Sequence, residues 1–339
     1  MKNIFKLLVV VALIAFYSVG CKKNNPSVPK NGFSSVDSSQ QVFTQNAMAT
    51  QSYCSYNDTE NYASPRMIYG SQGTVFSIPN FAFANSLGMS YPGPVCINFK
   101  EFYKTSDLIL NNISTYRDLD TVNGHKQWIM KSEAIFYINV MAGGLPFNIV
   151  NPIGIEFPVN DTYNNEIYNA NWDSLHFLGM TYPNTVWWVP NDVTTITQGY
   201  NQQNQFVDVI GCDSTGWINV ADTNWWNGDQ GGPTLTYTLF PPTSSSFSDV
   251  QIFLVLGKRI VAKAYPIYQG NTRYEIPNVP LHANGTLVAW CVSSGKQLLY
   301  QITPVTNLVN SNSTFTFSFT QTTSIDSLTT FIKALDAQY

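Results

Sequence analysis

Residues 216–229, GWINVADTNWWNGD, concentrate side chains that could bind a ligand. They hold three of the chain's eight tryptophans and five Asp or Asn residues, of which four, Asp222, Asn224, Asn227 and Asp229, are considered as calcium ligands. Indole rings stack on flat apolar faces such as those of sugar rings, and carboxylate or amide oxygens accept hydrogen bonds or bind Ca²⁺. Three interpretations are therefore open: a sugar-binding platform, a calcium loop, and a packed joint between two domains.

The packed joint is the favoured interpretation. Neighbouring residues of a strand point to opposite faces, so Trp225 and Trp226 would rarely present both rings to one ligand. The spacing of the four oxygen-bearing residues also departs from the EF-hand pattern, which makes the calcium site a weak candidate. Trp187 and Trp188 form a second adjacent pair, for which the same alternation places one ring inward. These four tryptophans are the candidate contacts for a ligand or a partner.

Catalytic motifs are scarce in this chain. None of its three histidines lies near another His or a Cys at ligand spacing, and metalloprotease, nucleophile-elbow, dinucleotide and P-loop patterns are missing from the sequence. Two carboxylate pairs, Glu101 with Asp107 and Glu133 with Glu156, could serve as acid and base in glycoside hydrolysis. Such pairs arise in any chain, and Glu101 is expected instead to hydrogen-bond a nearby turn. The sequence therefore favours a protein without catalysis or cofactor over a glycoside hydrolase.

The N-terminus predicts export and a lipid anchor. Residues 1–20 read as a signal peptide, with two lysines before an apolar run that is too short to span a bilayer. The sequence SVGC, ending at Cys21, resembles a bacterial lipobox in which Cys21 would carry the lipid; ordinary cleavage near Gly20 is the alternative. Lys22 follows in place of the Asp that retains lipoproteins at the inner membrane. We therefore expect an outer membrane lipoprotein on the periplasmic or cell-surface face. Residues 21–40 are polar and rich in Ser, Asn and Pro, which indicates a flexible tether.

Charge and cysteine content narrow the class of protein further. Loss of residues 1–20 removes two lysines and no acid, so the formal net charge changes from −4 to −6, and nucleic acid is not an expected partner. Aromatic residues make up 14% of the chain and charged residues only 11%, a balance that favours strands of an extracytoplasmic β protein. Cys54, Cys96, Cys212 and Cys291 could form two disulfides there, and buried free thiols are the alternative.

Strand patterns recur along the chain. Ile153, Ile155 and Phe157 alternate with Gly154 and Glu156, the period of a half-buried strand, and residues 234–240 and 314–320 alternate similarly. Residues 134–141, 250–256 and 287–292 are apolar nearly throughout, which predicts strands that are buried more fully. Glycine-containing turns separate these runs.

These patterns predict an all-β fold of two consecutive β-sandwich domains. The first would span residues 41–190, an inter-domain joint 191–232, and the second 233–339, whose seven strand candidates favour an immunoglobulin or transthyretin type of sandwich. Residues 324–339 show helical spacing instead, with Asp326 as a candidate N-cap, and predict a short C-terminal helix.

Residues 70–115 resemble the start of a module of uncharacterised Bacteroidota envelope proteins. That module contains a glycine, IP-x-x-x-F, spaced glycines, and a strand ending in E-[FIL]-[YF]-x-x-x-D-[ML]-[IL] before a loop that ends in Thr. The matching positions are Ile78, Pro79, Phe83, Gly88, Gly93, Glu101, Tyr103, Asp107, Leu108, Ile109 and Thr115. The module is similar to the ZU5 sandwich, and the same proteins continue with a Gly-Trp-Ile-Asn-Cys-Asp segment, in which Val220 replaces the Cys here, and a second β domain. The resemblance covers most of residues 70–335 and implies architectural roles for these residues, with no activity to transfer.

These observations together favour a non-catalytic, lipid-anchored cell-envelope protein that acts as an interaction subunit of an envelope protein assembly. The alternative is a carbohydrate-binding surface lipoprotein that holds polysaccharide with exposed Trp and Tyr loops. Asp120, Asp173 and Asp326 each begin an Asp-Ser/Thr-apolar triplet, like the sites that Bacteroidota glycosylate after export.

Overall fold

The computed structural model describes residues 36–57, 64–119, 126–158, 174–182, 185–191, 196–200, 206–222, 225, 234–240, 247–266, 273–308 and 314–339. The expected signal peptide, Cys21 and most of the expected tether lie outside these residues. So do the triplet that begins at Asp120 and the Asp173 of the second triplet, whose other two residues begin β11 (Ser174–Tyr182). The triplet at Asp326 lies at the start of a helix whose Leu328 is buried. None of the described helices combines the length and the apolar character that crossing a bilayer requires.

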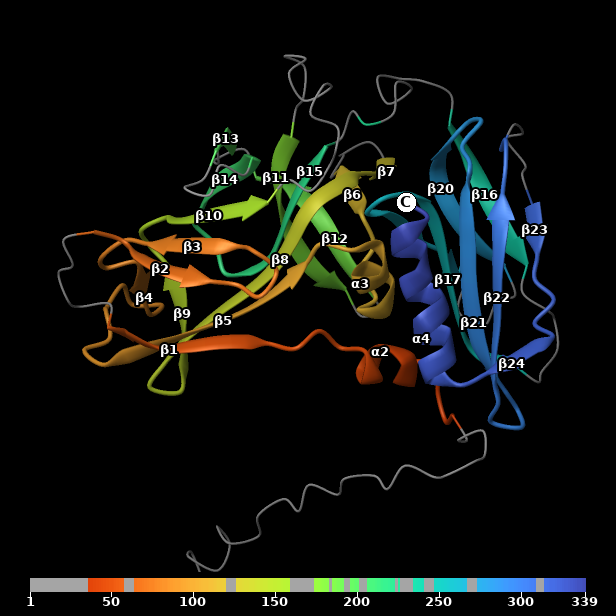
Figure 1. Cartoon of the computed structure of the whole chain (residues 1–339), viewed down its shortest axis with the longest axis horizontal. Helices are drawn as coiled ribbons and strands as arrows, with labels where there is room; N and C mark the ends of the chain where they lie inside the picture. Colours follow the sequence, from red (N-terminus) through yellow and green to blue (C-terminus); the bar gives the residue numbers. More distant parts are fainter. Residues whose placement is uncertain are drawn as a thin grey trace, which may run out of the picture. The chain divides into compact units, whose positions relative to one another are not determined.

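The described chain is mainly β structure, arranged in two sandwiches (Figure 1). The larger sheet of the first sandwich follows, from edge to edge, β1 (Gln51–Asn57), β5 (Pro94–Phe102), β8 (Lys131–Ala142), β15 (Gly216–Asp222), β11 (Ser174–Tyr182), β12 (Thr185–Pro190), β6 (Tyr116–Leu119) and β7 (Lys126–Ile129). A hairpin partner of β8, β9 (Leu145–Ile149), extends it and pairs with β4 (Phe83–Ala84). The facing sheet runs in the order β13 (Ile196–Tyr200), β14 (Phe206–Cys212), β10 (Ile153–Pro158), β3 (Val75–Ile78) and β2 (Arg66–Tyr69).

The second sandwich is smaller and closes the chain. One sheet orders β19 (Tyr265–Pro266), β20 (Tyr274–Pro280), β16 (Thr234–Phe240) and β23 (Thr314–Thr316). The other orders β18 (Ile260–Lys263), β17 (Phe247–Gly257), β21 (Gly285–Ser293), β22 (Leu298–Val305) and β24 (Gln321–Thr323). The expected all-β fold with two sandwiches and a C-terminal helix is confirmed.

Alternation explains the burial of these strands. Ile153, Ile155 and Phe157 of β10 are fully buried between the sheets, as their period of two predicts. In contrast, residues 314–320 do not form the single strand expected from their phenylalanines. Thr314–Thr316 pair with β16 in one sheet, and from Gln321 onward the chain pairs with β22 in the other. Phe317 and Phe319 nevertheless stay buried, with stacked rings 5.5 Å apart.

The two sandwiches share one apolar cluster where they meet, and we call this contact the seam. Phe102, Ile113 and Trp188 of the first sandwich are buried in the same cluster as Phe253 and Trp290 of the second. Residues 35–339 accordingly form one compact unit. Each sandwich also has a core of its own.

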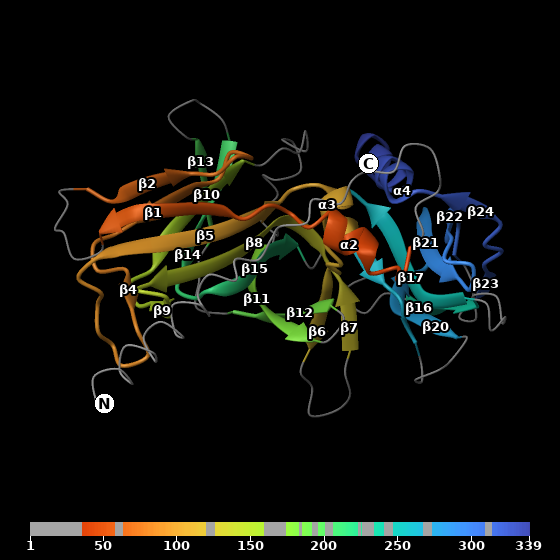
Figure 2. The same ribbon diagram turned by 90° about the horizontal axis from the view of Figure 1, so that it is seen from below.

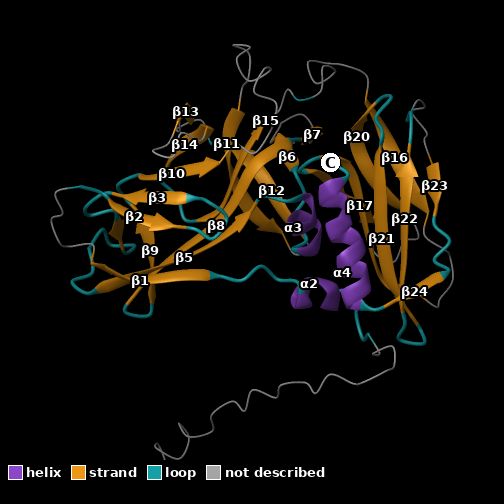
Figure 3. Cartoon of the chain, viewed as in Figure 1, coloured by secondary structure: helices purple, strands orange, loops and turns teal. Residues whose placement is uncertain are grey.

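Helices are concentrated at the seam (Figure 3). They are α2 (Gln41–Gln45), α3 (Thr105–Leu110), α4 (Ile325–Ala334) and the 3₁₀ turn η1 (Leu335–Ala337), and α4 contacts both α2 and α3. Ser324, and not the expected Asp326, caps α4, because its Oγ accepts a hydrogen bond from the backbone N–H of Ser327 at 3.1 Å. Asp326 lies in the first turn instead.

The start of the described chain packs against the second sandwich and in the apolar cluster of the seam. Val36, expected in the flexible tether, is buried and donates its N–H to the carbonyl of Lys296 at 2.9 Å. Phe43, expected in the first domain, packs edge-on against Phe253 and Trp290. The chain then continues into β1 at the edge of the first sandwich, so sandwich membership does not follow sequence order (Figure 2).

The expected joint, residues 191–232, is also assigned differently by the structure. Its described strands β13, β14 and β15 belong to the first sandwich, and β15 pairs with β8 on one side and β11 on the other. Five consecutive residues of β15, Ile218–Asp222, are buried, so both faces of this strand are covered. A central strand is buried on both faces, and its sequence therefore lacks the alternation that would distinguish it from a connecting segment.

Candidate functional site

Glu101, at the end of β5, organises the turn that connects β2 to β3. Its buried carboxylate accepts hydrogen bonds from the backbone N–H groups of Gln72 and Thr74, both at 3.3 Å, and from the side chains of Thr74 and Gln51. Gln72 Nε2 also donates to the Glu101 carbonyl oxygen at 2.8 Å. The prediction that Glu101 bonds a nearby turn is confirmed, and its carboxylate is enclosed by that turn.

Glu133 lies apart from Glu156, with which it was paired as a carboxylate candidate. It occupies a bulge of β8, where the register with β15 shifts. Phe157 and its cross-strand partner Asp208 face the sandwich interior, whereas Glu156 points to the other face of β10. The structure therefore brings Glu133 to Asp208 and separates it from Glu156.

A buried charged cluster surrounds Glu133 at the seam. Burial is the main cause that raises the pKa of the Glu133 carboxyl, and the adjacent Asp208 carboxyl raises it further. Arg259 and Lys131 act in the opposite direction. Arg259 comes from the two-residue turn between β17 and β18 of the second sandwich, has a φ of 57°, and is 2% exposed. A buried arginine of one sandwich therefore lies beside carboxyl groups of the other, which ties the two electrostatically.

Hydrogen bonds from backbone and side-chain groups join the sandwiches beside this cluster. Thr115 N donates to Val261 O at 2.8 Å, and Val261 N donates to the Thr115 hydroxyl at 3.1 Å. Tyr116 Oη donates to Pro277 O at 3.0 Å. Thr115 is thus a docking residue for the second sandwich.

The four candidate tryptophans do not form one exposed surface in the described chain. Trp188 is fully buried, and its Nε1 donates to Ser114 O at 2.7 Å. Trp225 is partly buried against the second-sandwich core and donates its Nε1 to Ile129 O at 2.8 Å. Trp188 is thus the inward ring that strand alternation predicts for its pair, and Trp225 is packed against the second sandwich. The Trp187 side chain and Trp226 lie outside the residues that can be described.

The calcium and cysteine candidates are resolved in part. Of the four calcium candidates only Asp222 is described, and it is buried at the end of β15. Within the described ranges no three His, Cys, Asp or Glu side chains gather as a metal-binding group. Cys54 and Cys96 form a disulfide between β1 and β5, whereas Cys212 and Cys291 are buried free thiols, and burial raises the pKa of each to about 12.

Exposed apolar side chains gather at the β4–β9 end of the first sandwich. This group, which we call the apolar end, consists of Phe81, Leu87, Met89, Leu145 and Val150. Leu87 is 78% exposed and Leu145 63% exposed. The pairing of β4 with β9 and of β9 with β8 brings their loops together, and Val150 N donates to Ala82 O at 2.8 Å.

The loop that carries Leu87 and Met89 satisfies its own backbone. The Asn85 side chain accepts the N–H groups of Leu87 and Met89 at 2.9 and 3.0 Å, and its carbonyl accepts that of Gly88 at 2.9 Å. These three N–H groups keep their acceptors when water is removed from the loop. The free-energy cost of covering the loop with a partner is therefore lower.

Phe81 is presented in an unfavourable backbone conformation. Its φ is 55°, a region that bulky residues rarely adopt, and its side chain is 50% exposed. Such a conformation costs free energy, and a half-exposed ring offsets only part of that cost by burial. Strained residues of this kind are often found at functional sites. The sequence around it is uncharged as well, because no Asp, Glu, Lys or Arg occurs from Met67 to Phe99 or from Ala134 to Ile155.

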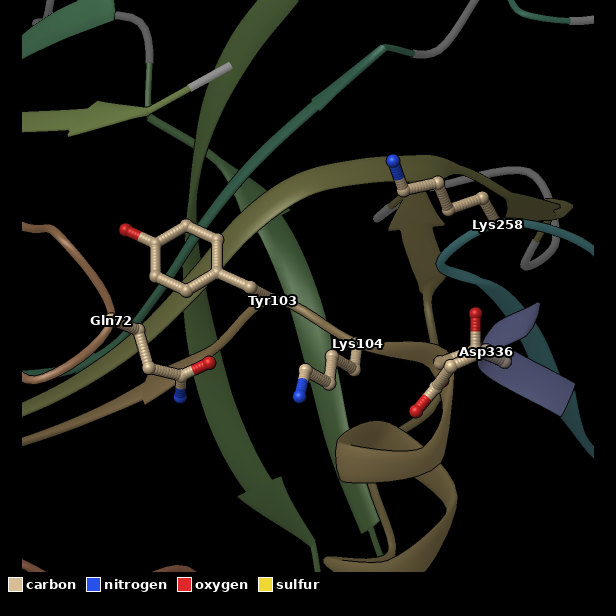
Figure 4. A pocket seen from close by; sticks show the side chains of 6 residues that line it. Gln72, Tyr103, Lys104, Lys258 and Asp336 are labelled. Carbon is tan, nitrogen blue, oxygen red and sulfur yellow. The ribbon is translucent and has the colours of Figure 1, made fainter. Parts of the chain in front are cut away.

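A cleft of about 460 Å³ opens at the seam, as Figure 4 shows. Gln72 and Tyr103 border it on one side, Lys258 and Asp336 on the other, and Lys104 lies between them. Thr105 completes its lining. The wall thus combines residues from the 70–74 turn, the start of α3, the β17–β18 turn and η1.

No protein-family model and no curated protein sequence matches this chain. The site residues therefore rest on geometry alone. Sequence reasoning focused on tryptophans and missed the apolar end, although the uncharged run from Met67 to Phe99 could have indicated it. The cleft had no comparable signal, because its lining comes from four separate segments.

Proposed function

We propose that this chain is a non-catalytic cell-envelope protein, lipid-anchored at Cys21, that acts as an interaction subunit of an envelope protein assembly. The apolar end is the observation that carries the proposal. Five exposed apolar side chains lie on two uncharged stretches whose strands pair with each other, and soluble proteins seldom expose such residues together unless a partner covers them. The internally bonded 85–89 loop and the strained Phe81 favour a surface that is covered in the working state.

The arrangement of the carboxylates supports a role without catalysis. Glu101 is enclosed by the 70–74 turn, and Glu133 is buried beside Asp208 and Arg259. Glycoside hydrolysis needs two carboxyl groups that flank a substrate. Neither of these carboxyl groups lines the seam cleft.

The test is purification of the tagged full chain from its own membranes in mild detergent, followed by mass spectrometry. We expect a partner protein in near-equal amount, and we expect Leu87→Ser together with Met89→Ser to remove it. Phe331→Ser is the matched control, since Phe331 is also an exposed apolar residue, at 41%, but lies on α4.

Two outcomes would contradict the proposal. One is recovery of the protein alone. The other is a partner that the double variant and the control retain equally. In the second case a partner would exist, but the apolar end would not bind it.

A further inference from the structure

The lining of the seam cleft includes two lysine side chains. Lys104 is exposed, and its ammonium makes no hydrogen bond or ion pair with any described residue. Lys258 contributes a second ammonium to the lining. The charge of Lys104 already acts on its surroundings, because it lowers the pKa of nearby Asp107 against the effect of burial.

Thr105 adds a buried donor that has no acceptor in the described chain. Its hydroxyl oxygen accepts the backbone N–H of Arg259 at 2.9 Å, and its own proton finds no partner there. The residue is 1% exposed and lines the cleft. A buried hydroxyl proton without an acceptor is costly, so a ligand atom that accepts it would be favoured.

The one carboxylate of the lining is already engaged. Asp336 Oδ1 accepts the backbone N–H of Ser106 at 2.9 Å, and Oδ2 accepts the Ser106 hydroxyl at 2.6 Å. Both Asp336 carboxylate oxygens therefore accept hydrogen bonds from the first turn of α3. Asp107 adds a second carboxyl group close to Lys104 and Asp336. These acids are opposed by Lys104 and Lys258, with Arg259 buried behind Thr105.

We propose that the seam cleft binds a small polar molecule through an oxyanion group, a carboxylate or a phosphate, held by Lys104 and Thr105. A volume of about 460 Å³ lies within the range of small-molecule sites and has room for a sugar ring beside the anionic group. An acidic monosaccharide thus fits both the size and the charge of the cleft. This inference does not depend on the apolar end, which belongs to other loops.

The test is isothermal titration of the full chain in detergent, with sodium glucuronate and, separately, inorganic phosphate as probes. We expect saturable binding of at least one probe, and its identity distinguishes a carboxylate from a phosphate ligand. Lys104→Met should weaken binding at least about tenfold, because an ammonium–oxyanion contact is a strong, charge-assisted hydrogen bond. Thr105→Ser should retain binding, and Thr105→Val should weaken it.

Lys333→Met is the control, because it removes the same charge from an exposed position of α4 outside the cleft. Thermal melting of every variant verifies folding, and Lys104 is exposed enough for its replacement to be tolerated. The proposal is overturned if the wild type binds neither probe. It is also overturned if Lys104→Met and Lys333→Met bind alike.

Discussion

Gly70 and Glu101 show how one buried carboxylate restricts its neighbours. A Cβ on Gly70 would overlap the Glu101 carboxylate, which is held in place by the 70–74 turn. Glycine is required at position 70 because the Glu101 carboxylate approaches its backbone closely. The backbone angle is not the reason, since the φ of Gly70 lies outside the left-handed region. Gly70 and Glu101 thus belong to one structural unit.

We expect Gly70→Ala to lower the free energy of unfolding by about 1–3 kcal/mol, since the new methyl group must displace the carboxylate or the turn. Gly154→Ala is the matched control, because the nearest atom to its Cβ is 3.4 Å away, an ordinary contact. Urea denaturation measures both. Equal stability of the two variants would contradict the expected overlap.

Glu133 should make stability depend on pH. Its pKa in the folded protein is raised above the ordinary 4.5 by burial and by Asp208, with Arg259 and Lys131 acting in the opposite direction. The folded protein therefore keeps a proton that the unfolded chain releases, and the free energy of unfolding falls as pH rises above about 4.5. Glu133→Gln, which stays neutral, should flatten this slope between about pH 5 and 7. Parallel stability curves for the wild type and the variant would be inconsistent with this account.

At the scale of elements, the C-terminal turn η1 supports the start of α3. Asp336 accepts the two hydrogen bonds of Ser106 and so replaces the side-chain cap that Lys104, the N-cap residue of α3, does not provide. Burial raises the pKa of Asp107 to about 6, and the negative charge of Asp336 is the second cause of this shift. Two elements separated by more than two hundred residues therefore depend on one side chain.

Asp336→Ala should lower the free energy of unfolding by roughly 1 kcal/mol at neutral pH, as loss of a helix cap does. It should also lower the pKa of Asp107, because a neighbouring negative charge is removed. Denaturation and NMR titration of the Asp107 carboxyl measure the two effects. Asp326→Ala, an exposed acid in the first turn of α4, is the control and should leave the Asp107 titration unchanged.

At the scale of the molecule, the seam makes the two sandwiches one folding unit. Trp188 and Ile113 share a buried cluster with Trp290 and Phe253, and residues from Val36 to Val42 complete it from the N-terminal side. Separation of the two sandwiches would expose the apolar side chains of this cluster to water.

Residues 36–339 should therefore unfold in a single transition, with coincident urea curves by tryptophan fluorescence and far-ultraviolet circular dichroism. Residues 233–339 alone should fail to give a cooperative transition, because Trp290 would lose Phe43 and the partners of the first sandwich. Two separate transitions in the longer protein would show instead that the sandwiches fold independently.

Strand predictions succeeded where local period and burial agree. Ile153, Ile155 and Phe157 alternate, and the run 287–292 lies within a fully buried stretch of β21, as expected. The joint was assigned incorrectly because β15 is covered on both faces and its Trp217 suggested a domain contact. Glu101 was placed correctly, while Glu133 was paired with the wrong carboxylate, because sequence distance does not tell which sheet face a residue occupies.

The sequence by itself determined the β class, the approximate strands and the C-terminal helix, because period and turn residues act over a few neighbouring positions. Only the tertiary structure decided that Val36 and Phe43 pack on the last sandwich, that the Cys54–Cys96 disulfide joins β1 to β5, and that Lys104 and Lys258 share a cleft. These contacts join residues that are distant in the chain. Their free energy depends on the packing of whole sheets, and no local pattern of residues encodes it.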